Sequence, residues 1–546
     1  MHVQYPVVFT GGTVFDGEAL LAPGTDVVID DGTITAIGPG LAASAAASAT
    51  IVELDGGLLL PGFIDAHVHP IEGGLERMRC DLSEGATRED YLRIVAEYAD
   101  ANPDAPWILG GGWQMAAFPG GVPLASDLDA IVGDRLVFLS NRDHHGSWVS
   151  SATLAAAGIT ADTPDPADGR IERDASGAPS GVLQEGARLL VTHLVPEDTE
   201  DDNYEALLSA QAYLHSLGVT GWQDAIVGDY GNHSDTGDVY LRAAKNGDLT
   251  ARVVAALWWD REKGIEQLPG LLARRAELQH DRFAATSIKI MQDGIPENQT
   301  AAMIDPYFVG GCRCGDSGSG ISFVDPAVLT DYVTALDAEG FQVHFHAIGD
   351  RAVREALDSL EETKKRNGES DGRHHIAHIQ IVHPDDVPRF AEIGVAANLQ
   401  ALWATWEPQM VDLNLPVLGD ERASWQYPFG DIARSGARLG AGSDWPVTNP
   451  NPWLALHVAV NRTFVADDPD YTDLVFFPEQ SLDLATAIAA YTAGSAYLNH
   501  SDSAGRIRVG FDADLVITDR DPFAGEPDDI GRTRTTQTWV RGHRVF

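Results

Sequence analysis

Two histidines stand two residues apart in the sequence Asp65-Ala-His-Val-His-Pro, at the end of an apolar run that predicts a β-strand. Side chains two residues apart on a strand point to the same face, so His67 and His69 can approach one metal ion together. Imidazole nitrogen is a common ligand of zinc. The motif therefore predicts a metal site at the end of this strand.

Four further ionisable residues lie near the ends of later apolar runs. They are Lys289, His346, His378 and Asp444. A charged group in such a position is costly unless it is paired or coordinated. Together with the first two histidines they form a nitrogen and oxygen ligand set suited to zinc or a similar divalent ion.

Some of these assignments have rivals among neighbouring histidines. His344 shares a strand face with His346 but lies one step deeper, and the Ala-Ile-Gly-Asp turn that follows favours His346 at the rim of the strand. His378 is the best placed in its own segment. Its rivals lie at the beginning of the strand or past its end: His374, His375 and His383.

Two other assignments have a structural alternative. Asp444 lies in a sharp turn before Trp-Pro, where an aspartate often serves as a turn or cap residue. Lys289 could form a buried ion pair with a carboxylate such as Asp293.

The ligands need a scaffold that brings several strand ends together. Short apolar runs alternate with helical stretches such as AVREALDSLEETKKR, which is typical of βα units around a parallel sheet. The candidate strands are GFIDAHVH, GVTGWQDA, RVVAALWW, SIKIMQDG, FQVHFHAIG, RHHIAHIQIV, GVAANLQA and ARLGAGSDWPV. They predict an α/β fold with a TIM-type (β/α)8 barrel, in which active sites lie at the carboxyl ends of the strands.

The remaining segments predict two additions to the barrel. Residues 1–60 and 500–546 contain short runs of alternating apolar and polar residues, so we expect antiparallel strands that form one composite β-sandwich domain. Residues 61–499 would form the barrel. The long connection after its first strand, 75–215, predicts an inserted subdomain over the active site.

Composition narrows the function classes. Acidic residues outnumber basic ones 81 to 37, for a formal net charge of −44, which disfavours nucleic acid and anionic membranes as partners. Solubility and a saline habitat are both compatible with this charge. With no apolar run of eighteen residues and no secretory signal pattern, we expect a cytoplasmic protein. The three cysteines, Cys80, Cys312 and Cys314, have no zinc-finger spacing and predict no cysteine site.

Several longer motifs extend these observations. They are PGFIDAHVHP at 61–70, GVLQEGA at 181–187, IKIMQDG at 288–294, HFHAIGDRAV at 344–353, IAHIQ at 376–380, GSDWPV at 442–447 and GFDADLVI at 510–517. In these motifs the chain resembles the amidohydrolase superfamily, and more narrowly the amidohydrolase 3 family, the branch that includes N-substituted formamide deformylase. The resemblance runs nearly from end to end.

The resemblance implies a division of the ligands between two metal ions. His67, His69 and Asp444 would bind the more buried ion, and His346 and His378 the more exposed one. Lys289, as an N-carboxylated lysine, would bridge the two Zn²⁺ or similar ions. Without that modification a site for one divalent ion is the alternative.

This ligand set predicts hydrolysis. A bound metal lowers the pKa of water toward neutrality and polarises a carbonyl, so hydroxide can attack an amide or N-substituted formamide and break its C–N bond. Asp444 would serve as general base and then as general acid. A metal-dependent esterase, lactonase or carbamate hydrolase would use the same site. A non-catalytic scaffold is the remaining alternative, although all six ligand positions are intact.

The substrate pocket is less well defined by the sequence. His145 in the insertion is a candidate for contact with the substrate carbonyl, and Gln184 and Glu185 lie in the GVLQEGA motif. Trp113 and Asp293 are further candidates for substrate binding. Twelve tryptophans favour an apolar, aromatic pocket for a small, hydrophobic substrate. A homodimer is compatible with the sequence.

Overall fold

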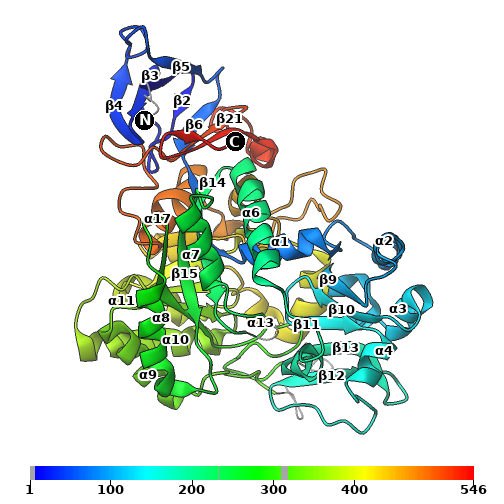
Figure 1. Cartoon of the computed structure of the whole chain (residues 1–546). Coiled ribbons are helices and arrows are strands. Elements are labelled where there is room, and N and C mark those ends of the chain that lie inside the picture. The colour runs from blue at the N-terminus through cyan, green and yellow to red at the C-terminus, as the bar shows by residue number, and fades with distance from the viewer. Residues whose placement is uncertain (1–5, 231–232, 309–317) are drawn as a thin grey trace.

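Eight parallel strands form the central barrel of the computed structural model, which describes residues 6–230, 233–308 and 318–546 (Figure 1). In sheet order they are β7 (Phe63–Val68), β14 (Val219–Val227), β15 (Arg252–Trp258), β16 (Phe283–Met291), β17 (Gln342–Ala347), β18 (His375–His378), β19 (Ala396–Leu399) and β20 (Leu439–Ala441). Each overlaps one of the eight predicted runs. The barrel fold predicted from the sequence is thus confirmed.

The two end strands of this sheet, β20 and β7, meet through hydrogen bonds made just beyond β20. The amide of Asp444 donates to the carbonyl of His67 at 2.7 Å, and the amide of His69 donates to the carbonyl of Trp445 at 2.8 Å. The amide of Ser443 donates to Oδ1 of Asp65 at 3.0 Å. We call this junction the seam of the barrel.

Helices cover the outside of the barrel between successive strands. The main ones are α6 (Glu200–Ser216), α7 (Gly237–Asn246), α8 (Leu268–Glu277), α9 (Pro326–Ala338), α10 (Asp350–Asn367), α11 (Val387–Ile393) and α14 (Phe429–Arg434). The start of α6 is set by a capping box, in which Thr199 and Asp202 each accept a hydrogen bond from the other's backbone amide. None of the helices in the described ranges combines the length and apolar character needed to span a membrane.

Both ends of the chain contribute to a pair of small sheets beside the barrel, coloured blue and red in Figure 1. One sheet has the order β4 (Thr33–Pro39), β3 (Thr25–Asp30), β1 (Val7–Thr10) and β5 (Thr50–Glu53). The other has the order β2 (Thr13–Val14), β6 (Leu58–Pro61), β21 (Leu515–Thr518), β22 (Thr535–Val540) and β23 (His543–Arg544). Pairing of β6 with β21 joins the two ends of the chain.

Two strand pairs in these sheets differ from the antiparallel arrangement predicted for the chain ends. β1 pairs with β5 in parallel, and β2 pairs with β6 in parallel. The reason for the first pair is topological. Strand β4 already runs in the direction of β1, because both pair antiparallel with β3, so residues 40–49 carry the chain back across the sheet before β5 begins.

A six-stranded sheet lies between β7 and β14 in the chain, within the segment 75–215. Its order is β12 (Gly169–Arg173), β13 (Pro179–Glu185), β11 (Gly146–Val149), β10 (Leu136–Asn141), β9 (Trp107–Trp113) and β8 (Cys80–Asp81). Helix α1 (Pro70–Met78) precedes this sheet and packs against α6. Cys80 is buried in β8, whereas Cys312 and Cys314 lie outside the described residues.

We predict that the terminal sheets depend on the packing of Trp539 from β22 against Phe9 from β1, whose rings meet edge to face at 5.3 Å. Replacing Trp539 by alanine should lower the free energy of unfolding by about 3 to 5 kcal/mol, because a large buried ring is lost. Urea denaturation measures this loss. Phe546→Ala is the control, since Phe546 is 44% exposed and its loss should cost about 0.5 kcal/mol or less. Equal losses in the two variants would contradict this packing.

Candidate functional site

The predicted ligands face one cavity of about 460 Å³ at the carboxyl-terminal end of the barrel. Four of them lie on strands, namely His67 on β7, Lys289 on β16, His346 on β17 and His378 at the end of β18. His69 begins helix α1 as its N-cap. Asp444 follows β20 with a left-handed backbone, at φ 58°. The barrel brings together all six side chains that the sequence analysis selected as ligands.

Part of the wall of this cavity belongs to the segment that carries the six-stranded sheet. The lining residues from that segment include Asp143, His144, His145, Asp168, Glu185 and Arg188. Ile295 and Ile348, which come from loops of the barrel, pack into the hydrophobic core of the same segment. The cavity is therefore enclosed jointly by the barrel and this segment.

The centre of the site is the carboxylate of Asp444. Its Oδ1 lies 3.1 Å from Nε2 of His67 and 3.1 Å from Nε2 of His69. Its Oδ2 lies 3.9 Å from Nδ1 of His378. The amine of Lys289 lies 3.3 Å from Nε2 of His67. Among the described residues, Lys289 forms no ion pair with Asp293, and its amine instead lies beside the imidazole of His67.

The donor atoms at this centre fit a divalent metal ion. His67, His378 and Asp444 are buried, and one ligand atom from each lies within 4.8 Å of the others. Within the described ranges, neither ring nitrogen of His378 has a hydrogen-bond partner, and the same holds for Nε2 of His346. Buried nitrogen atoms are rarely left unpaired. A cation bound among them would satisfy these lone pairs.

Burial and neighbouring charges fix the protonation of the group. Burial, followed by the nearby amine of Lys289, lowers the pKa of His67 to about 3. Burial also lowers the pKa of Lys289 to about 7 and the pKa of His344 well below its usual range. Burial alone would raise the pKa of Asp444, but the adjacent imidazoles hold it well below its usual range. Neutral imidazoles and an ionised carboxylate are the forms that bind metal.

His378, which the resemblance assigns with His346 to the more exposed ion, lies close to the ligands of both ions. Its ring centroid is 4.7 Å from that of His67 and 4.3 Å from that of His346. The ring centroid of His346 also lies 5.7 Å from that of His145. The ligands assigned to the two ions therefore adjoin each other.

His145 and Glu185 form a second acid–base pair in the cavity wall. Nδ1 of His145 lies 2.9 Å from Oε1 of Glu185, which also accepts a hydrogen bond from the hydroxyl of Thr300. Burial disfavours the charged form of His145, but the carboxylate of Glu185 outweighs this effect and raises its pKa. The pair can therefore present a protonated imidazole to the cavity.

Trp113 and Asp293 do not line the cavity, in contrast to their selection as substrate-binding candidates. The ring of Trp113 packs against Phe118 and Trp148, and its indole N–H donates to the carbonyl of Leu139. The carboxylate of Asp293 accepts three backbone amides, from Ile348 and Gly349 directly before α10 and from Ala302 in the connection between β16 and α9. Both side chains serve the packing of the fold around the site.

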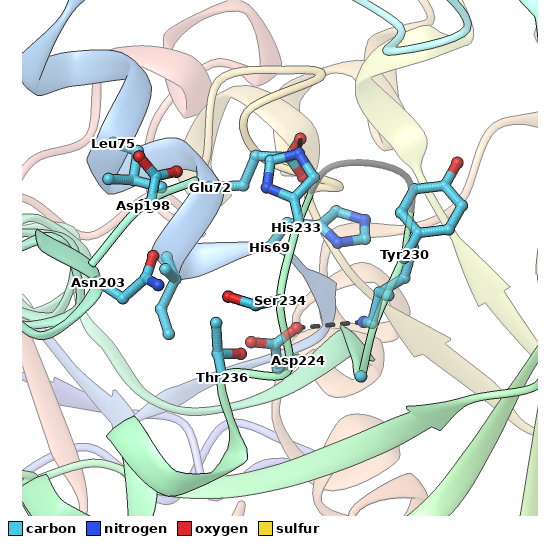
Figure 2. Close-up of a pocket in the computed structure, with 13 residues that line it drawn as sticks. His69, Glu72, Leu75, Asp198, Asn203, Asp224, Tyr230, His233, Ser234 and Thr236 are labelled. Atoms are coloured by element: carbon cyan, nitrogen blue, oxygen red, sulfur yellow. Dashed lines mark hydrogen bonds and ion pairs between the residues drawn. The ribbon is translucent and has the colours of Figure 1, made fainter. Parts of the chain in front are cut away.

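A cluster of charged side chains in the cavity was missed by the sequence analysis. Glu72 lies on α1, with Oε1 2.9 Å from Nδ1 of His144 and 3.4 Å from Nε2 of His233. Figure 2 shows Glu72, His233 and His69 around a second pocket, and the same three residues also line the cavity. Glu72 and Glu76 stand four residues apart directly after the two-histidine motif, and Nε2 of His144 lies 3.3 Å from Glu76. The four-residue spacing of Glu72 and Glu76 was the one sequence signal for this cluster.

The cavity is more polar than the tryptophan content suggested. Of the twelve tryptophans, Trp258 and Trp403 line it, and the ring centroid of Trp403 lies 5.1 Å from that of His378 in a stacked arrangement. Trp148, Trp222 and Trp259 are instead buried in the core. Arg261 and Asp168, which form an ion pair, also line the cavity. The wall therefore combines aromatic and charged side chains.

Comparison with known proteins identifies the class of protein that this fold and site define. Residues 50–546 match the Amidohydrolase family. The chain belongs to this family, as its motifs predicted, and it is a metal-dependent hydrolase of the amidohydrolase superfamily.

Individual relatives cover nearly the whole chain. It is 30% identical to the putative amidohydrolase YtcJ of Bacillus subtilis, over 91% of this chain and 90% of the relative. It is 29% identical to the protein LONG AFTER FAR-RED 3 of Arabidopsis thaliana, over 99% of this chain and 91% of the relative. N-substituted formamide deformylase of Arthrobacter pascens is 24% identical, over 94% of each chain. An uncharacterized metal-dependent hydrolase of Pyrococcus furiosus has a similar structure, with a TM-score of 0.68 and 25% identity. The match covers 95% of this chain and 99% of that one.

We predict that Gly442 maintains the seam that positions the ligands. A Cβ atom at Gly442 would lie 2.5 Å from the backbone nitrogen of His67, so Gly442→Ala must displace β20 and with it Asp444. Zinc affinity, measured by competition with a chromophoric chelator, should fall about 10-fold or more.

Gly440→Ala, on β20 two residues before Gly442, is the matched control. Its Cβ would meet the side chain of Leu498 at 2.3 Å, so it should lower stability without weakening zinc binding. Unchanged affinity in the Gly442→Ala variant would contradict the role assigned to the seam.

Proposed function

We propose that this protein hydrolyses a C–N bond in a small amide or N-substituted formamide. The observation that carries the proposal is the convergence of His67, His378 and Asp444 at the base of a cavity large enough for such a molecule. The similarity to N-substituted formamide deformylase supports the choice of bond.

The six predicted ligands would hold one or two Zn²⁺ ions. A bound divalent ion supplies two effects, acidification of water near neutral pH and polarisation of the substrate carbonyl. Lys289 is the proposed bridge, as a carboxylated lysine. Its amine is buried beside His67, where a free ammonium would be costly, and the negative charge of a carbamate would be matched by the cations.

Asp444 is the proposed proton carrier. It is held ionised at the centre of the site, so it can accept the proton of the attacking water and then deliver it to the leaving nitrogen. His145, held by Glu185, is the proposed hydrogen-bond donor to the substrate carbonyl. A donor fixed in this way stabilises the negative charge that develops on the oxygen during attack.

The aromatic side chains that line the cavity are the proposed binding site for the substituent on the substrate nitrogen. Trp258 and Tyr230 contact each other at a centroid distance of 4.5 Å, and both line the cavity. A panel of formamides, other amides, esters and lactones, tested with protein of known metal content, examines the proposal directly. Turnover of esters or lactones without turnover of any amide would assign the site to the other bond class.

We predict that Asp444→Asn retains much of its metal but loses turnover. The amide still offers an oxygen ligand, whereas it cannot shuttle a proton, so kcat should fall about 10² to 10⁴-fold. Steady-state kinetics on a hydrolysed substrate, with metal content determined on the same sample, measure the effect. A metal-replete variant with normal kcat would remove Asp444 from the proton-carrying role.

We also predict that Lys289→Ala loses metal and activity, and that a small carboxylic acid added to the buffer partly restores both. The added carboxylate would occupy the position of the lysine carbamate and supply the two oxygens of the bridge. Metal content and rate are measured with and without the acid. Full activity of the alanine variant in the absence of any acid would rule out a required bridge.

A further inference from the structure

The interior of the barrel below the ligands contains an unusual set of polar side chains. Barrel interiors are filled mainly by branched aliphatic residues. Here five buried polar side chains enter from four adjacent or nearby strands: Gln223 from β14, Gln342 and His344 from β17, His375 from β18 and Asn398 from β19. Burial of polar groups is costly unless they are hydrogen bonded, so their mutual bonds determine how each is oriented.

The direction of these bonds is fixed at the base of the barrel. Nε2 of Gln342 donates to the backbone carbonyls of Arg373 and Leu498, at 2.8 and 2.7 Å. Carbonyl oxygens can only accept, which sets the orientation of the Gln342 amide. Its oxygen therefore accepts from Nε2 of Gln223, at 2.9 Å. The side-chain oxygen of Gln223 must in turn point away from the base of the barrel, toward the predicted ligands.

This oxygen determines which nitrogen of each neighbouring imidazole carries hydrogen. Oε1 of Gln223 lies 2.6 Å from Nδ1 of His344 and 3.0 Å from Nε2 of His375. Because an amide oxygen only accepts, both of these nitrogens carry hydrogen. A neutral imidazole has one N–H, so Nε2 of His344 is left with a lone pair.

The lone pair on Nε2 of His344 faces His67 on β7. Nε2 of His344 lies 2.8 Å from Nδ1 of His67. Nδ1 of His67 must therefore donate, which leaves the lone pair on its Nε2. That atom faces Oδ1 of Asp444 at 3.1 Å. Two acceptors this close are stabilised by a positive group beside them, and the amine of Lys289 also lies 3.3 Å from Nε2 of His67.

We propose that Gln342, Gln223 and His344 form a one-way hydrogen-bond relay that fixes His67 in its Nδ1–H form and presents its Nε2 to the metal. These three are positioning residues, because none of them touches the cavity. The inference rests on the proposed role of His67 as a metal ligand. Partners of this kind commonly contribute 10 to 100-fold, as an order of magnitude, to metal affinity.

His375 offers a matched control for this relay. It shares the oxygen of Gln223 and is as deeply buried as His344. Its other nitrogen lies 3.4 Å from the side-chain amide of Asn398, which is not one of the predicted ligands. Loss of His375 should therefore disturb the core to a similar extent without changing which ring nitrogen of His67 carries hydrogen.

The experiment compares zinc affinity in full-length variants by competition with a chromophoric chelator. His344→Phe keeps a ring but removes the acceptor, so zinc affinity should fall about 10 to 100-fold. His344→Gln can place an oxygen near the lost Nε2 and should restore most of the affinity. His375→Phe should bind zinc like the unmodified protein. Urea denaturation of the metal-free proteins reports how much each change destabilises the fold.

A second variant tests the relay if His344→Phe does not fold. Gln223→Met has a similar volume but no acceptor for His344, and it should also weaken zinc binding. Wild-type affinity in either His344→Phe or Gln223→Met would overturn the proposal. An equal loss of affinity in His375→Phe would also overturn it, because the effect would then arise from general loosening of the core.

His67→Ala separates this inference from the proposed function. If His67→Ala binds zinc as tightly as the unmodified protein, the proposed ligand set is wrong and the relay has no metal ligand to position. If His67→Ala loses affinity while His344→Phe does not, the ligand set stands and the relay alone is overturned.

Discussion

Closure of the barrel at the seam is the constraint on which the site depends. The strands β20 and β7 are far apart in the chain, yet the residues after β20 bond directly to the strand that carries His67. Asp65 contributes from inside the seam, since its Oδ1 accepts the amides of both His67 and Ser443. The same few bonds that close the sheet therefore set the distance between Asp444 and the two histidines of the motif.

The surroundings of the ligands divide into two parts with different tasks. Below them, a polar core with directed hydrogen bonds links the ligand strand to backbone carbonyls at the base of the barrel. Above them, the segment with the six-stranded sheet supplies charged side chains to the cavity wall, among them His145, Glu185 and Asp168. In the proposed relay the lower part orients the ligands, whereas the upper part encloses the cavity in which they lie.

Much of this arrangement could be predicted from the sequence, for identifiable physical reasons. Barrel strands are covered on both faces and so appear as apolar runs, and an imidazole at the end of such a run stands out, as His67 does. Trp113 could not be assigned, because a tryptophan in a core and one in a pocket have the same local pattern. The contact of Glu72 with His144 depends on how two distant segments meet, which no local spacing records. His344 was recognised as lying deeper than His346, but its partners were not.

The pairing of β6 with β21 has a consequence for the synthesis of the protein. About 450 residues separate these strands, so at about 5 to 20 residues per second the ribosome needs about 20 to 90 s to deliver the partner of β6. During that time the apolar strand Leu58–Pro61 has an unpaired edge. Such an edge is a template for association with other chains. Nascent chains would therefore benefit from a chaperone that covers β6 until translation nears its end.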